Sequence, residues 1–337
     1  MKSFHHLLAV CILPVLLAAC VAGQPDKLAV ATDPDDESGI GGTGIIGAIT
    51  GFGSIFVNGV EVEIDDRTQL FIDEQPADNT GFERGDVVEI LAGEQRGITH
   101  ARRIQLRHEV IGTVERVDGS RFNLLGQTVL YTTQTGYVPQ VGDTVQVSGF
   151  RDAEGLIHAT RIAPDKQKRT LLRGTVHKTG NGYFYIGRQK VTVRNNPDIQ
   201  TGDTVRVRGQ LLGDNLKASN LTVMRSLPFG EDVQRLLVQG FIQKQPQGYR
   251  IDHIPLTPAG NGTGVPFTTR GQQPVRLELR RDTRNHWIPA RLINEKGLQR
   301  GNPVPVPRNA PRWRSPAMPG FPGGMPRSPG MGGRGGH

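Results

Sequence analysis

The sequence is poor in cysteine and has no apolar run long enough to cross a membrane as a helix. Two Cys in 337 residues exclude a disulfide scaffold and a zinc site built from several cysteines. The apolar run at residues 7–18 has twelve residues, whereas a spanning helix needs about 20. Hydrophobic residues make up only 36% of the chain, below the average for soluble domains. By contrast, 44 Gly and 23 Pro argue against an all-helical protein, because both residues destabilise helix interiors.

Local motifs of the common enzyme classes are also missing. There is no Gly-x-Ser-x-Gly elbow, no His-Glu-x-x-His pair and no phosphate-binding Gly-Lys-Thr loop. Residues 39–44 match the spacing Gly-x-Gly-x-x-Gly, but an acidic segment precedes them and a strand-like pattern follows. A dinucleotide site needs a strand before this motif and a helix after it. We therefore predict a protein that is not an enzyme and has no catalytic residues, cofactor or metal ion.

The N-terminus has the pattern of a secretory signal that ends in a cysteine. The apolar run closes on residues 17–20, Leu-Ala-Ala-Cys. Small residues before a cysteine resemble the lipobox of bacterial lipoproteins. The resemblance implies that residues 1–19 are removed and that Cys20 carries diacylglycerol and a further acyl chain such as palmitate, which together anchor the protein to a membrane. In Gram-negative lipoproteins, Val21 rather than Asp after the cysteine implies the periplasmic side of the outer membrane. The alternative is an ordinary signal peptide with an incidental cysteine.

Segments towards both ends of the sequence lack a periodic apolar face. Residues 20–44 are acidic and Gly-rich, and we predict a disordered tether there, because such a segment buries too little surface to offset its ordering entropy. Residues 296–337 hold seven basic residues and no acidic one, with nine Pro and nine Gly after position 300. We predict a disordered tail with polyproline character. Its basic residues favour binding to anionic envelope polymers, and the alternative is a soluble, unstructured extension without a partner. Since most of the net charge of +8 lies in this tail, the folded body need not bind nucleic acid, and we expect no such partner.

An internal repeat is the strongest signal in the chain. Each unit opens with a Gly in an apolar stretch, carries a Gly-Asp pair before alternating aliphatics, and closes with an Ala and, three positions later, an aliphatic residue. The opening residues are Gly47, Gly112, Gly174 and Gly240. The Gly-Asp pairs are Gly85-Asp86, Gly142-Asp143 and Gly202-Asp203. The closing pairs are Ala101 and Ile104, Ala159 and Ile162, Ala218 and Leu221, and, in a diverged fourth unit that lacks the Gly-Asp pair, Ala290 and Ile293.

The pattern within a unit predicts a small closed barrel. Alternating aliphatics mark half-buried strands, Asp-Gly and Gly-Asp mark turns, and the opening Gly is expected to permit a sharp strand bend. In the second unit this predicts strands near residues 110–117, 121–124, 128–131, 144–148 and 156–162. Five strands without a helix predict an all-β fold of tandem OB-like barrels, three clear and one degenerate. The expected units are residues 45–109, 110–164, 171–225 and the diverged 229–295.

These landmarks resemble a family of bacterial lipoproteins with tandem repeats, catalogued as the domain of unknown function numbered 5666. The resemblance rests on the Gly-rich residues 39–44, on the Gly-Phe-Gly-Ser-Ile and Val-Asn-Gly segments within residues 51–59, and on the Gly-Asp and Ala-x-x-Ile elements. It covers residues 39–225 well and 237–295 poorly. It implies a β-barrel fold and a location in the cell envelope, and it implies no activity.

The third unit carries the best candidate binding surface. Residues 171–225 have nine basic and three acidic side chains, whereas residues 45–109 have six and twelve. OB-type barrels bind ligands on their second and third strands, where aromatic rings stack and basic side chains hold phosphate. The residues at these places are Tyr183, Tyr185, Arg188 and Lys190. The alternative is that the aromatic residues fill the barrel and the charges form a solvated face.

Two histidines share a repeat position but do not predict a metal site. His100 and His158 each lie just before the closing Ala. If equivalent positions of successive units came close together, the two imidazoles would share a metal ion. The third unit has Lys217 at that place and the fourth has Pro289. Descent from a common repeat explains the pair without any ligand.

The sequence as a whole predicts a lipid-anchored cell-envelope protein that binds or scaffolds other components, without a defined activity. The alternative is a ligand- or metal-sensing accessory module of the periplasm, with an OB-type binding face on the third unit. No prediction of the oligomeric state follows from the sequence.

Overall fold

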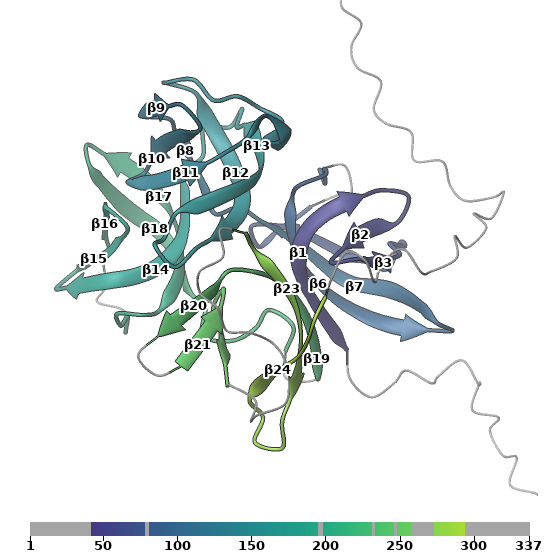
Figure 1. The fold of residues 1–337 in the computed structure, drawn as a ribbon. Coiled ribbons are helices and arrows are strands. Elements are labelled where there is room, and N and C mark those ends of the chain that lie inside the picture. The colour runs from purple at the N-terminus through teal and green to yellow at the C-terminus, as the bar shows by residue number, and fades with distance from the viewer. Residues whose placement is uncertain are drawn as a thin grey trace, which may run out of the picture. The chain divides into compact units, whose positions relative to one another are not determined.

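The computed structural model describes residues 42–77, 81–194, 198–230, 233–245, 248–257 and 273–293. All of them belong to one compact unit, Ser38–His337. In these ranges the regular structure consists of β-strands and the single-turn 3-10 helix η2 (Thr133–Thr135), which confirms the predicted all-β fold (Figure 1). None of the described segments forms a helix that would be long and apolar enough to cross a bilayer. The predicted lipidation site Cys20 and the tail at residues 296–337 lie outside the described residues.

The strands follow the predicted units, which we number repeats 1 to 4. Repeat 1 contains β1 (Thr43–Gly51), β2 (Ile55–Val57), β3 (Val60–Val62), β4 (Gln69–Ile72), β5 (Gln75–Pro76), β6 (Val87–Gln95) and β7 (Ile98–Arg107). Repeat 2 contains β8 (Val110–Thr113), β9 (Arg116–Asp118), β10 (Arg121–Leu124), β11 (Gln127–Leu130), β12 (Thr144–Arg151) and β13 (Ile157–Pro164). Repeat 3 contains β14 (Leu171–Gly180), β15 (Tyr183–Ile186), β16 (Gln189–Thr192), β17 (Thr204–Leu212) and β18 (Asn215–Val223). Repeat 4 contains β19 (Arg235–Gly240), β20 (Ile242–Gln245), β21 (Gly248–Ile251), β22 (Ile254–Leu256), β23 (Val275–Arg281) and β24 (Trp287–Leu292).

Repeat 3 is a closed five-stranded barrel. β14 pairs with β15 on one side and with β17 on the other, so the order β14-β15-β16-β18-β17 returns to β14. The pairs are antiparallel except for β16 and β18, which run parallel. Because successive side chains of a strand point to opposite faces, every second residue fills the barrel, and Phe184, Val205 and Val207 are buried there. Closure pairs the strand edges that would otherwise be exposed.

The other repeats use the same pairings with local changes. In repeat 2 the first strand is broken, so that β8 pairs with β12 and β9 pairs with β10, while β11 runs parallel to β13. All five strand ranges predicted for this repeat are observed, to within three residues at each end. Repeat 1 adds the hairpin β4–β5, which pairs along β7. In repeat 4, β22 is joined to β24 by the hydrogen bond from the Thr257 amide to the Trp287 carbonyl.

The Gly-Asp pairs form the same turn in repeats 1 to 3. Their glycines have φ of +91°, +93° and +101°, a region that residues with a side chain rarely adopt. The Asp that follows turns its carboxylate back onto the backbone amide three residues earlier and accepts a hydrogen bond from it. These bonds run from Glu83 to Asp86, from Gln140 to Asp143 and from Gln200 to Asp203, at 2.8, 2.8 and 3.0 Å.

The opening glycines have a different role from the predicted strand bend. The φ angles of all four lie outside the left-handed region, and the breaks in the first strand fall about two residues later, for example between Val176 and Lys178. A Cβ added at Gly47 would lie 2.5 Å from Asn58 Oδ1, and one at Gly174 would lie 2.5 Å from Ile186 Cγ2. These glycines are therefore required for a close approach of side chains from the following hairpin.

The closing alanines mark a β-bulge. In repeat 1, Ala101 pairs with Ala92 and the next residue, Arg102, is the extra residue of the bulge. Repeats 2 and 3 have the same bulge after their Ala. In repeat 4, Ala290 is itself the extra residue. The predicted fourth closing pair is therefore wrong by one position, because the register aligns Pro289 and Leu292, not Ala290 and Ile293, with Ala101 and Ile104.

Two sheets join the repeats in pairs. β1 of repeat 1 runs parallel to β19 of repeat 4, and β8 of repeat 2 pairs with β14 of repeat 3.

The β1 pairing also moves the predicted end of the tether. Thr43 and Gly44 lie in β1, because their backbone pairs with β6 on one side and β19 on the other. Gly44 has no room for a side chain, since its Cβ would lie 2.7 Å from both Phe229 and Leu236.

Candidate functional site

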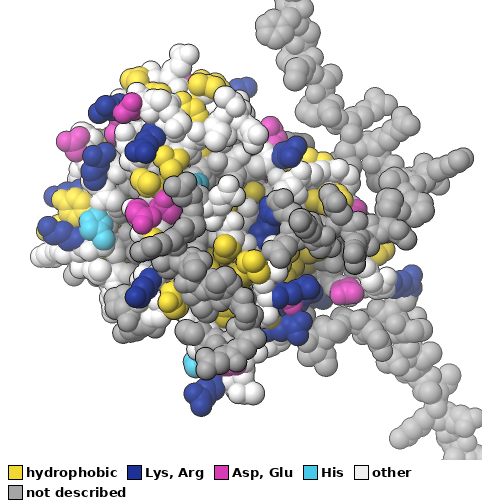
Figure 2. Space-filling view, viewed as in Figure 1, with side chains coloured by type: hydrophobic (Ala, Val, Ile, Leu, Met, Phe, Trp, Pro, Cys, Tyr) yellow, Lys and Arg dark blue, Asp and Glu magenta, His cyan; other side chains and the backbone are white. Residues whose placement is uncertain are grey.

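An outer row of repeat 3 combines tyrosines with lysines. Pairing places Lys178 of β14 opposite Tyr185 of β15, and Tyr185 opposite Lys190 of β16. Tyr183 lies two residues before Tyr185 and therefore on the same face. We call these four residues the tyrosine–lysine face. Figure 2 shows basic, hydrophobic and histidine side chains gathered at the left of the view, where β14 and β15 lie in Figure 1.

The rings and ammonium groups of this face contact one another. The Tyr183 and Tyr185 rings meet edge to face, with centroids 6.0 Å apart. The Lys190 Nζ lies 4.8 Å from the Tyr183 centroid, and the Lys178 Nζ lies 5.7 Å from the Tyr185 centroid, which are cation–π distances. Both tyrosines are half-buried. The face therefore offers ring surface beside positive charge, a combination suited to an anionic ligand that has flat apolar faces.

The structure supports the binding hypothesis for some residues of this segment and the core interpretation for another. Tyr183, Tyr185 and Lys190 come together on the outer face, as the binding hypothesis requires. Phe184 points inward and is 2% exposed, as the core interpretation requires. Arg188 is not part of the row, because it lies in the turn between β15 and β16, and its backbone amide donates to the Gly126 carbonyl of repeat 2.

Equivalent positions in the other repeats lack this combination. In repeat 2 the hairpin register places Arg121 and Asn123 where repeat 3 has its two tyrosines, and Thr128 where it has Lys190. In repeat 4 the corresponding residues of β21 are Gly248 and Arg250. Lys178 was not among the predicted residues; it joins the face because the β14–β15 hairpin, after a break in its register between Val176 and Lys178, places it opposite Tyr185.

The two histidines that share a repeat position each have a partner of their own. His158 Nε2 lies 2.7 Å from Asp152 Oδ2, and its ring packs on Phe241 at 4.5 Å. His100 Nδ1 lies 3.7 Å from Glu63 Oε2. Among the described residues, no group of three or more His, Cys, Asp and Glu side chains is placed to hold a metal ion.

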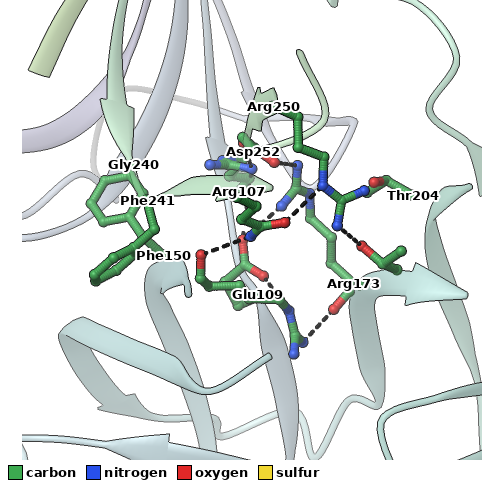
Figure 3. A pocket seen from close by; sticks show the side chains of 13 residues that line it. Arg107, Glu109, Phe150, Arg173, Thr204, Gly240, Phe241, Arg250 and Asp252 are labelled. Atoms are coloured by element: carbon green, nitrogen blue, oxygen red, sulfur yellow. Dashed lines mark hydrogen bonds and ion pairs between the residues drawn. The ribbon is translucent and has the colours of Figure 1, made fainter. Parts of the chain in front are cut away.

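The second feature is a buried cluster of charges where all four repeats meet. Its central groups are Arg107 at the end of β7, Glu109 after it, Arg151 at the end of β12, Arg173 on β14 and Asp252 after β21. Figure 3 shows these side chains around one small cavity, with Phe150 and Phe241 beside it. The side chains of Arg107, Glu109 and Arg173 are each 4% exposed or less. We call this group the interior ion cluster.

Its ion pairs are short and shared. Arg173 contacts Glu109 at 2.8 Å and Asp252 at 2.6 Å. Asp252 also contacts Arg107 at 2.7 Å, and Glu109 contacts Arg151 at 3.0 Å. Charges buried in this way are tolerated when each has an opposite partner at close range.

The neighbours set the ionisation of the cluster. Burial by itself would raise the pKa of Asp252, but the charges of Arg107 and Arg173 outweigh it and hold that pKa well below its usual range. Burial would lower the pKa of Arg173, but Asp252 and Glu109 outweigh it and raise that pKa. The pKa of Arg151 is lowered, mainly by burial. Asp252 and Arg173 thus hold opposite charges at neutral pH, as a structural joint requires.

No pattern in the sequence indicates this cluster, because its members come from separate repeats. Asp252 follows the hairpin strand β21 with φ of +56°, and Asn58 occupies the corresponding turn of repeat 1 with φ of +51°. Asn58 also reaches a neighbouring repeat, since its Nδ2 donates to the Leu237 carbonyl at 3.1 Å. The turn after the second strand is a contact point between repeats, a role that becomes visible only after the repeats are assembled.

A further buried pair lies where repeat 1 meets repeat 3. Asp73, in the turn of the β4–β5 hairpin, accepts from the His108 amide at 2.9 Å and lies 2.8 Å from His108 Nδ1. The next residue, Glu74, forms an ion pair with Arg206 on β17. Burial would raise the pKa of Asp73, but His108 and Arg206 outweigh it and hold that pKa below its usual value. Burial lowers the pKa of Arg206 to about 10.

The Asp73 pair predicts an acid-sensitive contribution to stability. The folded pKa lies below the unfolded value of about 3.9, so ionised Asp73 stabilises the fold above that pH, and this contribution is lost as pH falls through the folded pKa. Asp73→Asn is expected to cost about 1–3 kcal/mol at pH 7, with the difference from wild type shrinking below pH 4. Urea unfolding at pH 7, 5, 4 and 3 measures the difference in unfolding free energy between the variant and wild type, with the exposed Asp66→Asn as control. A difference that stays constant over this range would contradict the prediction.

The fold and the two sites define a class: an all-β repeat protein that contains a closed five-stranded barrel and a buried cluster of charges where its repeats meet. Residues 43–105 and 111–163 each match the family described as "Domain of unknown function (DUF5666)". The match confirms the resemblance that the sequence landmarks predicted, and the two matched segments correspond to repeats 1 and 2. A comparison with curated proteins found no match.

Proposed function

We propose that this protein is a lipid-anchored component of the cell envelope that binds or scaffolds other envelope components. The observation that carries the scaffolding role is the interior ion cluster, because ion pairs shared among four repeats fix the relative positions of their outer surfaces. The anchor rests on the lipobox-like residues before Cys20, and Val21 after it favours attachment to the periplasmic side of the outer membrane. The basic tail at residues 296–337 supports contact with anionic envelope polymers.

We also propose that all four repeats are OB-type barrels. Support comes from the order of pairings, in which the first strand lies between the second and the fourth and the third runs parallel to the fifth in repeats 2 and 3. In repeat 1 the parallel bridge from Glu63 to His100 supplies the equivalent contact. In repeat 4 the β22–β24 hydrogen bond does so.

A second candidate function is a periplasmic accessory module that binds a ligand on repeat 3. The tyrosine–lysine face favours it, because OB-type barrels use the second and third strands for binding and the other repeats lack tyrosines there. The described residues favour an organic anion over a metal ion as the ligand, since they bring no suitable group of metal-binding side chains together.

Cross-linking of the full chain in intact envelopes tests both functions. Partners are identified by mass spectrometry for wild type, for Cys20→Ser, and for Tyr183→Ala with Tyr185→Ala. If repeat 3 binds the ligand, the amount of partner cross-linked to the double variant is expected to fall at least ten-fold. Each tyrosine ring that is removed takes away about 1–3 kcal/mol of stacking free energy. Arg121→Ala, at the equivalent place in repeat 2, is the matched control and should retain the partner.

The pattern of losses separates the possibilities. Retention of partners in the tyrosine variant but loss in Cys20→Ser supports scaffolding through the anchor and other surfaces. Loss of the same partner in the tyrosine variant and not in Arg121→Ala supports the accessory module. The absence of any specific partner with wild type would refute both.

A further inference from the structure

The interior ion cluster holds more positive than negative charge. Its guanidinium groups are those of Arg107, Arg151, Arg173 and Arg250, whereas its carboxylates are those of Glu89, Glu109 and Asp252. Glu89 belongs to it through Arg107, whose Nε lies 3.5 Å from Glu89 Oε1. Four cations therefore face three anions in an interior where unneutralised charge is costly.

Arg250 is the cation of the cluster that hydrogen-bonds to neutral groups. Its Nε donates to Gln243 Oε1 at 2.7 Å and its Nη2 donates to Thr175 Oγ1 at 3.0 Å. The three other guanidinium groups each contact a carboxylate within 4 Å. Burial lowers the pKa of Arg250, and the nearby positive charge of Arg173 lowers it further, against a raising contribution from Asp252. An additional negative charge beside Arg250 would offset this lowering of its pKa.

A cavity lies beside this unneutralised guanidinium. It has a volume of about 30 Å³, and its polar lining includes four arginines, two carboxylates and two hydroxyl groups, those of Arg107, Arg151, Arg173, Arg250, Glu109, Asp252, Thr175 and Thr204. A space of that volume holds one or two particles the size of a water molecule. The guanidinium groups outnumber the carboxylates and, with the hydroxyl groups, are hydrogen-bond donors, so on balance the lining suits an anionic acceptor without protons.

We propose that this cavity binds one small inorganic anion of chloride size, which neutralises Arg250 and completes the joint between the four repeats. Water fits the same volume but leaves the excess charge in place. Phosphate, sulfate and the carboxylate of a larger molecule have several heavy atoms and need more space than a single small ion. The site is distinct from the tyrosine–lysine face and does not depend on a ligand there.

Thermal unfolding of the full chain tests the site. The midpoint is measured while sodium gluconate is replaced by sodium chloride at constant ionic strength, because gluconate is too large to enter. A ligand that binds only the folded state raises the unfolding midpoint. We therefore expect a saturable rise of several degrees at a chloride concentration about 100-fold above Kd. Arg250→Gln is expected to abolish the chloride-dependent part of the rise, whereas Arg116→Gln, whose side chain is 73% exposed, is expected to retain it.

Two further measurements keep the test decisive if Arg250→Gln fails to fold. Thr204→Val keeps the shape of the side chain, removes its hydroxyl group from the cavity, and is expected to weaken the chloride response at least several-fold. Crystals grown in bromide are expected to show an anomalous peak next to the Arg250 guanidinium. A midpoint that rises equally in gluconate and chloride, an unchanged response in Arg250→Gln or Thr204→Val, or a bromide-free cavity would each overturn the proposal.

Discussion

Replacing Arg173 by methionine is expected to lower the free energy of unfolding by about 3–5 kcal/mol. The change leaves the carboxylates of Glu109 and Asp252, now 2.8 and 2.6 Å from the Arg173 guanidinium, without their closest shared cation. A buried charge that loses its partner keeps the desolvation cost without the compensating attraction. Urea unfolding followed by circular dichroism measures the loss.

Two controls distinguish this mechanism from a general loss of packing. Arg116→Met removes an exposed pair, with Asp118 at 3.5 Å, and should change stability by less than about 0.5 kcal/mol. Combining Arg173→Met with Asp252→Asn should cost less than the sum of the single changes, because the two residues share one interaction. Strict additivity, or a loss below about 1 kcal/mol in Arg173→Met, would show that the cluster does not hold the repeats together.

Replacing Gly126 by valine is expected to destabilise the protein by about 3–5 kcal/mol, through two combined effects. Gly126 has φ of +62°, which a β-branched residue adopts only at a cost. Its Cβ would also lie 2.5 Å from the Gln189 backbone nitrogen, where repeats 2 and 3 meet. The backbone there cannot easily move, because the Arg188 amide donates to the Gly126 carbonyl and Gln127 Nε2 donates to the Ile186 carbonyl.

Gly119 offers a matched control for the junction itself. It has φ of +57°, and an added Cβ would meet no atom within 4 Å. Gly119→Val should therefore cost only the conformational part, about 1–2 kcal/mol. The difference between the two variants, measured by urea unfolding, isolates the contact between repeats. Equal losses would mean that the repeat 2–repeat 3 contact contributes nothing.

The strands and turns within a repeat could be predicted because their causes are local. Alternation of aliphatic residues places every second side chain in the barrel, so Val145 and Val147 were recognisable as core residues from spacing alone. The Gly-Asp turns were recognisable because only glycine tolerates the required φ and Asp completes the turn with its own carboxylate. The register error in repeat 4 arose because a bulge displaces the Ala by one residue, and a bulge leaves no regular spacing.

The candidate sites were only partly predictable. Tyr183, Tyr185 and Lys190 lie within one hairpin, so their shared face followed from strand alternation. Arg188 was assigned to the same face by proximity in sequence, yet the turn removes it from the row. Lys178 lies opposite Tyr185 only because the register of the β14–β15 hairpin is broken before it, and no regular spacing marks such a break. The whole interior ion cluster depends on contacts between distant segments, and no local pattern marks an arginine whose partner lies about 80 residues away, as with Arg173 and Asp252.

The amino-acid order by itself determined the all-strand character, the repeat length and the turn positions of this protein, because each is set by side chains a few residues apart. Only the tertiary structure decided which repeats pair, with repeat 1 beside repeat 4 and repeat 2 beside repeat 3. It also decided that charged residues of all four repeats meet in one interior. Both outcomes depend on which surfaces exclude water together, and that is a property of the assembled repeats.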